Sequence, residues 1–262
     1  MAGGGKLAGK VALISGGSRG IGRAIAGRFV EEGARVVIAA RGAESLERAV
    51  ADLNASGEVA VGVKADLSTA EGVAAVIDAA KEWGGVDILV NNVGRAPAGS
   101  VLTLTDEQFM EAFTLKFLAG VRLCRAAVPY MIERGGGSII NITGLGGREP
   151  GPDGAALAAT NGAIRGVTKS LARELAPKGI RVNAIAPGSV STERAVELAR
   201  QQAAARGVPV ETVQAEALSA TPSGRYVDPG EIAEVALLVA TGDVPSFTGT
   251  ELVVDGGRSH SL

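Results

Sequence analysis

The residues best placed for chemistry form a glycine-rich run near the start of the chain. The apolar segment Val11–Ser15 leads into Gly16-Gly17-Ser18-Arg19-Gly20-Ile21-Gly22, and an amphipathic stretch follows at once. Gly16 allows a tight turn, Gly20 lets backbone amides approach a bound group, and Gly22 lets the next helix lie close to the strand. An anion would lie at the positive end of that helix. The run therefore predicts a phosphate or diphosphate site, and the alternative is an ordinary strand-to-helix turn.

Two arginines indicate which phosphate-bearing molecule would bind. Arg19 near a helix N-terminus is unfavourable unless an anion offsets its charge. Arg41 follows the second apolar run, where the ribose of an adenine dinucleotide would pass, whereas NAD sites usually place an acid there. This run ends in Ala39-Ala40, and the nearest acid, Glu44, lies inside the next helical stretch. The pattern favours a 2′-phosphate and hence NADP(H) over NAD. The alternative is that Arg41 only solvates a loop.

Short apolar runs alternate with helical stretches along the whole chain. They lack the polar alternation of a half-exposed strand, so they predict strands buried on both faces, as in a parallel sheet. Right-handed crossovers then give an α/β, doubly wound parallel sheet of the Rossmann type in a single domain over residues 1–262, with a flexible N-terminus at 1–6. The predicted strands are Val11–Ser15, Arg35–Ala40, Val59–Lys64, Val86–Asn91, Ser138–Ile142, Arg181–Ala186 and an edge strand Glu251–Asp255.

Composition removes several classes of function. The net charge of −2 without basic runs argues against nucleic-acid binding, and 46% hydrophobic residues without a long apolar run argue against both disorder and a membrane span. A single cysteine, Cys124, and a single histidine, His260, argue against a disulfide, a cysteine-based metal site and histidine catalysis. No secretory signal is evident, so we expect a cytoplasmic protein without a metal.

Four further motifs, in register with the glycine run, resemble the short-chain dehydrogenase/reductase family over residues 7–257. They are Asp66-Leu67, Asn91-Asn92-Val93-Gly94, Pro187-Gly188-Ser189-Val190-Ser191-Thr192 and the terminal Thr248-Gly249 with Asp255-Gly256-Gly257. The resemblance implies a seven-stranded sheet, a bound NAD(P)(H) and a homodimer or homotetramer.

The resemblance also implies roles for matching residues. Asp66 and Leu67 would hold the adenine, Pro187, Gly188 and Val190 would flank the nicotinamide, and Thr192 would reach its amide or the diphosphate. Residues that would complete the cofactor site, on the ribose side or beside it, are Asn92, Val93, Gly94 and Thr143.

The catalytic residues implied by the resemblance are absent. The family uses a serine after the fifth strand and a Tyr-x-x-x-Lys whose i, i+4 spacing puts both side chains on one helix face. There the lysine lowers the phenol pKa from about 10, and the phenol protonates the alkoxide. Alignment through the flanking segments places Gly144 at the serine, Leu157 at the tyrosine and Asn161 at the lysine, and no Tyr-x-x-x-Lys occurs elsewhere.

Lys116 stands where the family has an asparagine, so lysine and asparagine are exchanged between this position and Asn161. We expect Lys116 to supply the missing ammonium group, and Asn161 is the second candidate catalytic residue. The alternative is that Lys116 is an exposed charge on a helix. Thr143 and Thr160 are candidates to hydrogen-bond a substrate oxygen. The charged residues of the Gly/Pro-rich loop after the fifth strand are expected to be solvated: Arg148, Glu149 and Asp153.

Three functions remain open. The first is an NADP(H)-dependent oxidoreductase with an unusual or impaired acid, acting on a carbonyl or alcohol. The second is a catalytically silent cofactor-binding protein, acting as partner subunit or redox sensor. The third is a non-redox enzyme, which no residue specifically supports. The helical segment 191–218 is a predicted lid over a small-molecule substrate. The Ala/Leu-rich stretches 106–132 and 154–176 predict self-association, or pairing with an active paralogue.

Overall fold

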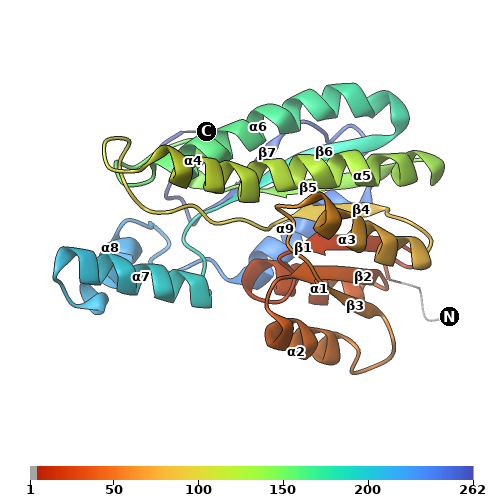
Figure 1. Cartoon of the computed structure of the whole chain (residues 1–262), viewed down its shortest axis with the longest axis horizontal. Coiled ribbons are helices and arrows are strands. Elements are labelled where there is room, and N and C mark those ends of the chain that lie inside the picture. The colour runs from red at the N-terminus through yellow and green to blue at the C-terminus, as the bar shows by residue number, and fades with distance from the viewer. Residues whose placement is uncertain (1–4, 262) are drawn as a thin grey trace.

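A computed structural model describes residues 5–261. Seven parallel strands form one central sheet in the order β3-β2-β1-β4-β5-β6-β7, with helices packed on both faces (Figure 1). This confirms the predicted doubly wound α/β architecture. The strands are β1 Val11–Ser15, β2 Arg35–Ala40, β3 Ala60–Lys64, β4 Ile88–Asn91, β5 Gly137–Ile142, β6 Ile180–Pro187 and β7 Glu251–Val254.

The two faces of the sheet carry two separate hydrophobic cores. One core lies under α1, α2 and α9, and the other under α3, α5 and α6. Every residue of β1 is buried, which is why the strand sequences lack polar alternation. The helices are α1 Gly20–Glu31, α2 Ala43–Leu53, α3 Ala70–Glu82, α4 Asp106–Ala112, α5 Ala119–Glu133, α6 Ala155–Leu175, α7 Glu193–Arg206, α8 Val210–Ser219 and α9 Pro229–Thr241.

The strand order reverses at β1, which pairs with β2 on one side and β4 on the other. The connections from these strands leave to opposite faces, so a crevice opens outside their C-terminal ends. Ser15, the last residue of β1, holds the two ends together. Its hydroxyl donates to the carbonyl of Val90 (3.2 Å) and accepts from the amides of Asn92 (2.9 Å) and Val93 (3.1 Å).

The long helical region after β4 contains a π-helical turn that the sequence did not predict. The capping box of Thr105 and Gln108 starts α4, and the π turn Phe113–Leu118 then joins α4 to α5 without a break. A π turn inserts one extra residue per turn and shifts the helix faces beyond it. The Ala/Leu-rich stretch 106–132 therefore consists of two α-helices, α4 and α5, that are out of phase.

The segment predicted as a lid forms two helices, α7 and α8. They extend beside the main body, on the side where the strands have their C-terminal ends (Figure 1). They share a small cluster of buried side chains, Ala199, Ala203 and Val213. Of the segment 1–6, residues 1–4 lie outside the described residues, while the amide of Lys6 donates to Glu32. Between residues 5 and 261, no helix combines the length and the apolarity needed to cross a membrane.

Asp87 fastens the start of β4 to its neighbours. Its buried carboxylate accepts two hydrogen bonds from the Arg134 guanidinium, both 2.8 Å, and one from the Val11 amide, also 2.8 Å. Burial alone would raise the pKa of Asp87, but the hydrogen bonds from Arg134 and Val11 outweigh it and hold the pKa below its ordinary value. The contact joins β1, β4 and the end of α5.

We expect Asp87→Asn to lower the free energy of unfolding by about 2 kcal/mol near pH 7, because Arg134 loses a buried anionic partner. A carboxylate with a lowered pKa stabilises the fold above its unfolded pKa, and this contribution disappears as the pH falls through the folded pKa. Urea unfolding should therefore show the two proteins converging at acid pH. Asp78→Asn, which breaks only an exposed pair with Lys81, is the control and should change stability little. A pH-independent difference between Asp87→Asn and the parent would contradict this account.

Candidate functional site

A cleft of about 890 Å³ opens at the C-terminal ends of the central strands. It lies at the crevice expected from the reversal of strand order. Its walls come from the glycine loop, the end of β2, the segments after β4 and β5, the π turn and α7. The candidate residues that line it are Gly16, Ser18, Arg19, Gly20, Ile21, Arg41, Leu67, Asn92, Val93, Gly94, Lys116, Thr143 and Thr192.

The glycine loop is closely packed and its glycines are required. Gly16 and Gly20 have φ angles of +66° and +53°, in the left-handed region that favours glycine. A Cβ on Gly22 would overlap the carbonyl of Gly16 and lie 2.6 Å from the amide nitrogen of Asn92. The Asn92 side chain donates to the carbonyls of Ser15 (3.1 Å) and Gly16 (3.2 Å). Asn92 thus supports the loop, and no side chain caps the N-terminus of α1.

The cleft is strongly cationic. Six basic side chains line it against two carboxylates. Arg19 lies 3.5 Å from Glu193 at the start of α7, and Arg95 lies 3.4 Å from Glu111. The basic residues of the lining are Arg19, Arg41, Arg95, Lys116, Arg194 and Arg200, and the acidic ones are Glu193 and Glu197.

Arg194 and Arg200 were not singled out from the sequence. They stand with Glu197 at three-residue intervals on α7, so one helix face carries all three into the cleft. That spacing was a usable signal. The mixed charges of the segment concealed it, because such a stretch resembles an ordinary solvated face.

Lys116 is buried, with 9% of its surface exposed, so the alternative that it is an exposed charge on a helix is wrong. The π turn places the side chain inward, where it lines both the large cleft and a smaller cavity. Burial disfavours the ammonium form and lowers the pKa of Lys116 to about 8. A lysine with such a pKa can both hold and release a proton near neutral pH.

The three residues predicted to stand at the family's catalytic positions, Gly144, Leu157 and Asn161, lie close to one another but outside the cleft lining. Gly144 follows β5, and Leu157 and Asn161 lie on α6, with Leu157 partly exposed. The Asn161 amide donates to the Gly144 carbonyl at 3.4 Å, and its own oxygen has no hydrogen-bond partner in the described part of the chain. Neither glycine nor leucine offers a proton-donating group at the first two positions.

The two threonines are engaged elsewhere. Thr143 reaches the cleft, but its hydroxyl lies 3.0 Å from both the Ile185 carbonyl and the Glu251 carboxylate. Thr160 is fully buried and donates to the Ala156 carbonyl one helical turn before it. The expectation that Thr160 contacts a substrate is therefore wrong, because its hydroxyl is used inside α6.

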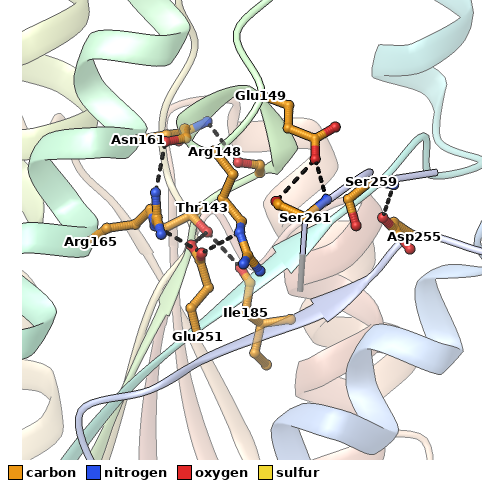
Figure 2. A network of polar contacts seen from close by, with 12 residues as sticks. Thr143, Arg148, Glu149, Asn161, Arg165, Ile185, Glu251, Asp255, Ser259 and Ser261 are labelled. Atoms are coloured by element: carbon orange, nitrogen blue, oxygen red, sulfur yellow. Dashed lines mark hydrogen bonds and ion pairs between the residues drawn. The ribbon is translucent and has the colours of Figure 1, made fainter. Parts of the chain in front are cut away.

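A buried carboxylate fixes the loop that follows β5 (Figure 2). Glu251 of β7 lies 2.9 Å from Arg165 of α6 and 3.9 Å from Arg148 of the loop. Arg165 also donates to the Gly147 carbonyl at 2.9 Å. The expectation that Arg148 is solvated is wrong, because its side chain is 15% exposed and packs against Glu251.

The rest of the loop differs from residue to residue. Glu149 accepts hydrogen bonds from the amides of His260 (2.6 Å) and Ser261 (2.8 Å), so the C-terminal segment is tied to the loop (Figure 2). These bonds hold the pKa of Glu149 below its ordinary value, although desolvation opposes them. Asp153 is exposed, as expected.

The remaining candidates for the cofactor site lie beside the cleft. Asp66 is exposed, and its carboxylate accepts from the Ser68 amide at 2.9 Å, which lowers its pKa. Pro187 ends β6, Gly188 packs against Asp255, and Val190 belongs to a hydrophobic core. Their expected contacts with adenine and nicotinamide stay predictions. No group of three or more metal-ligating side chains occurs among residues 5–261.

Comparison with known proteins finds relatives that are named as oxidoreductases or reductases. Residues 16–259 match the family model described as Enoyl-(Acyl carrier protein) reductase. The chain is 39% identical over 257 residues to Oxidoreductase UcpA of Escherichia coli, covering 97% of this chain and 96% of that protein. It is 36% identical over 255 residues to a putative ketoacyl reductase of Streptomyces coelicolor, covering 96% and 97% of the two chains.

Solved structures agree with these relatives. The L-sorbose reductase of Gluconobacter frateurii, complexed with NADPH and L-sorbose, superposes with a TM-score of 0.92 at 33% identity and covers 98% of each chain. A variant of actinorhodin polyketide ketoreductase with NADPH gives a TM-score of 0.91 at 34% identity, covering 96% of this chain and 98% of that one.

We expect Glu251→Gln to lower the free energy of unfolding by about 2 kcal/mol, because Arg165 and Arg148 then lose the buried charge between them. Thermal or urea unfolding measures the effect. Glu44→Gln is the matched control, since Glu44 pairs with Arg48 on the exposed surface of α2. Equal stability of the two variants would show that the Glu251 cluster contributes nothing beyond a surface pair.

Proposed function

Because this chain belongs to the short-chain dehydrogenase/reductase family of oxidoreductases, in the group whose model is described as Enoyl-(Acyl carrier protein) reductase, we propose that it uses NADP(H) to interconvert a carbonyl and an alcohol on a small-molecule substrate. The observation that carries this proposal is the cationic cleft beside the glycine loop. The family relatives solved with NADPH support it.

The residues of the cleft fit the phosphates of NADP(H). The backbone of the glycine loop leaves no room for a Cβ at Gly22, and the uncapped N-terminus of α1 would face the diphosphate. Arg41 lines the cleft just after β2, as Arg19 does just before α1, and no acidic side chain ends that strand. The excess of basic side chains matches a ligand that carries a 2′-phosphate in addition to its diphosphate.

Arg41→Ala should weaken NADPH binding by about 10- to 100-fold, the loss of one or two charge-assisted hydrogen bonds. NADH binding should change little, because NADH lacks the 2′-phosphate. Calorimetry with both nucleotides measures the two affinities. Arg48→Ala, on the exposed side of α2, is the control and should leave both unchanged. Equal losses for NADPH and NADH would place Arg41 elsewhere than at the 2′-phosphate.

We infer that the family's proton donor has been lost and that Lys116 replaces it. Gly144, Leu157 and Asn161 occupy the family's catalytic positions without a group of suitable acidity. Bound NADPH would supply the hydride to the carbonyl carbon. Lys116, at the wall of the cleft, would hold a proton on Nζ and give it to the oxygen that becomes the alcohol. With a pKa of about 8, the lysine is mostly protonated at neutral pH.

Lys116→Met should lower kcat for carbonyl reduction by about 10²- to 10⁴-fold, the usual contribution of a general acid. In the parent enzyme the reduction rate should fall as the pH rises through about 8, since the ammonium form is the reactive one. The variant should lose this dependence while its NADPH affinity stays within a few-fold. Steady-state rates across pH give both readouts, and Lys178→Met on the exposed surface is the control. Unchanged turnover in Lys116→Met would remove the lysine from the mechanism.

A second function, a catalytically silent cofactor-binding subunit or redox sensor, is favoured by the apolar Leu157 and the bare Gly144 at the catalytic positions. It predicts tight NADPH binding without NADPH oxidation across a panel of aldehydes and ketones, and without reduction of NADP by alcohols. Turnover of any such compound by the purified chain would exclude it.

The predictions of a lid, of self-association and of a cellular location also belong to this proposal. The α7–α8 helices would act as the lid over the substrate, since α7 supplies part of the cleft wall. Self-association would use α5 and α6, where Ile132 and Leu157 are exposed apolar side chains. The partner would be a second copy, in a homodimer or homotetramer, or an active paralogue, and the location would be cytoplasmic.

A further inference from the structure

A small pocket adjoins the cleft at Lys116, which lines both. Its volume is about 20 Å³, enough for one water molecule. The π turn, α5, β5 and α6 contribute mostly apolar side chains to its walls. The polar or ionisable side chains that line it are Asn91, Lys116, Cys124 and Asn141.

The orientation of the Asn91 amide is fixed by a directed chain of hydrogen bonds. The Ile164 carbonyl can only accept, so the Thr168 hydroxyl donates to it (2.8 Å). The same hydroxyl then accepts from the Asn141 amide nitrogen (2.9 Å), which leaves the Asn141 oxygen to accept from Asn91 Nδ2 (2.9 Å). Asn91 Oδ1 is therefore an acceptor, and it is buried without a hydrogen-bond partner among residues 5–261.

Lys116, in contrast to Asn91 Oδ1, can only donate hydrogen bonds, because an ammonium group carries only donors. No hydrogen bond or ion pair joins Lys116 to another described residue. The buried acceptor Asn91 Oδ1 is costly when unpaired, and the Lys116 side chain lines the same cavity as well as the cleft. One water between the two side chains would accept from the lysine and donate to the asparagine.

Among the described residues that line the pocket, Lys116 is the one with a charged side chain. Cys124, from α5, is a buried thiol whose pKa burial raises to about 11, so it stays neutral. The lining residues from α6 are apolar, and Arg95 across the cleft is a cation paired with Glu111 of α4. Asn91 is thus the acceptor available to the lysine through the cavity.

We propose that the cavity is a one-water site and that Asn91 is a positioning residue, holding the Lys116 ammonium through that water. The bridge fixes the lysine side chain between cavity and cleft and favours its protonated form. The proposal deepens the function assigned to Lys116 and rests on it only for the link to turnover.

Gly120→Ala tests the site without altering a polar group. Gly120 lines the cavity, and a Cβ there would lie 3.5 Å from the Asn91 side chain, an ordinary contact. The added methyl occupies the water's space. We expect the pKa of Lys116 to fall by about one pH unit, the effect of one hydrogen bond to a charged group. Gly166→Ala is the matched control, since its Cβ would meet open space on α6.

The readout is the titration of the Lys116 Cε resonance in lysine-labelled protein, assigned by its absence in Lys116→Met. This measurement needs no turnover, so it separates the water site from the proposed catalytic role of Lys116, which fails if Lys116→Met keeps full activity. An unchanged Lys116 titration in Gly120→Ala, or an equal shift in Gly166→Ala, overturns the proposal.

Asn91→Asp provides a second test should Gly120→Ala fail to fold. A carboxylate in place of the amide oxygen should raise the pKa of Lys116 by at least about one pH unit, because it adds a negative charge across the same water. A lysine that titrates as in the parent protein would show that Asn91 does not communicate with it. A high-resolution structure with no density in the cavity would also overturn the proposal.

Discussion

The contact between the ends of β1 and β4 is the constraint on which the site depends. The Ser15 hydroxyl joins both strands, and Asn92 turns back to hold the carbonyls of the glycine loop. The strand order reverses at this point, so the loop from β1 and the segment after β4 part to opposite sides. The cleft therefore arises from the order of the strands. The hydrogen bonds of the Ser15 and Asn92 side chains hold its two edges together.

Two local features shape the surroundings of the cleft, the π turn and the contacts of Glu251. The π turn brings Lys116 into a buried position, where desolvation alone gives the amine a pKa of about 8. On the other side, Glu251 gathers Arg165, Arg148 and Thr143 around the end of β5. The loop that follows β5 is thus held by ion pairs and by the C-terminal segment.

The sequence alone predicted the sheet and the glycine loop because both depend on local patterns. Apolar runs marked all seven strands, although β4 begins at Ile88 and not at Val86 as predicted. The π turn was missed, since one extra residue per turn leaves little trace in an apolar helix. The Glu251–Arg165 pair joins residues far apart in the chain, so no spacing rule reveals it. The burial of Lys116 was one of two open alternatives and needed the packing of α6 to decide it.

The α7–α8 hairpin has its own small cluster of three buried residues, all of them short or β-branched, and its two helices are joined at Gly207, where φ is +64°. So little apolar surface cannot make a segment as persistent as the sheet beside it. Among the described residues, the hairpin therefore has much less buried apolar surface holding it than either of the two large cores. Because α7 also lines the cleft, this weakly held hairpin forms one wall of a cleft whose other walls rest on the sheet.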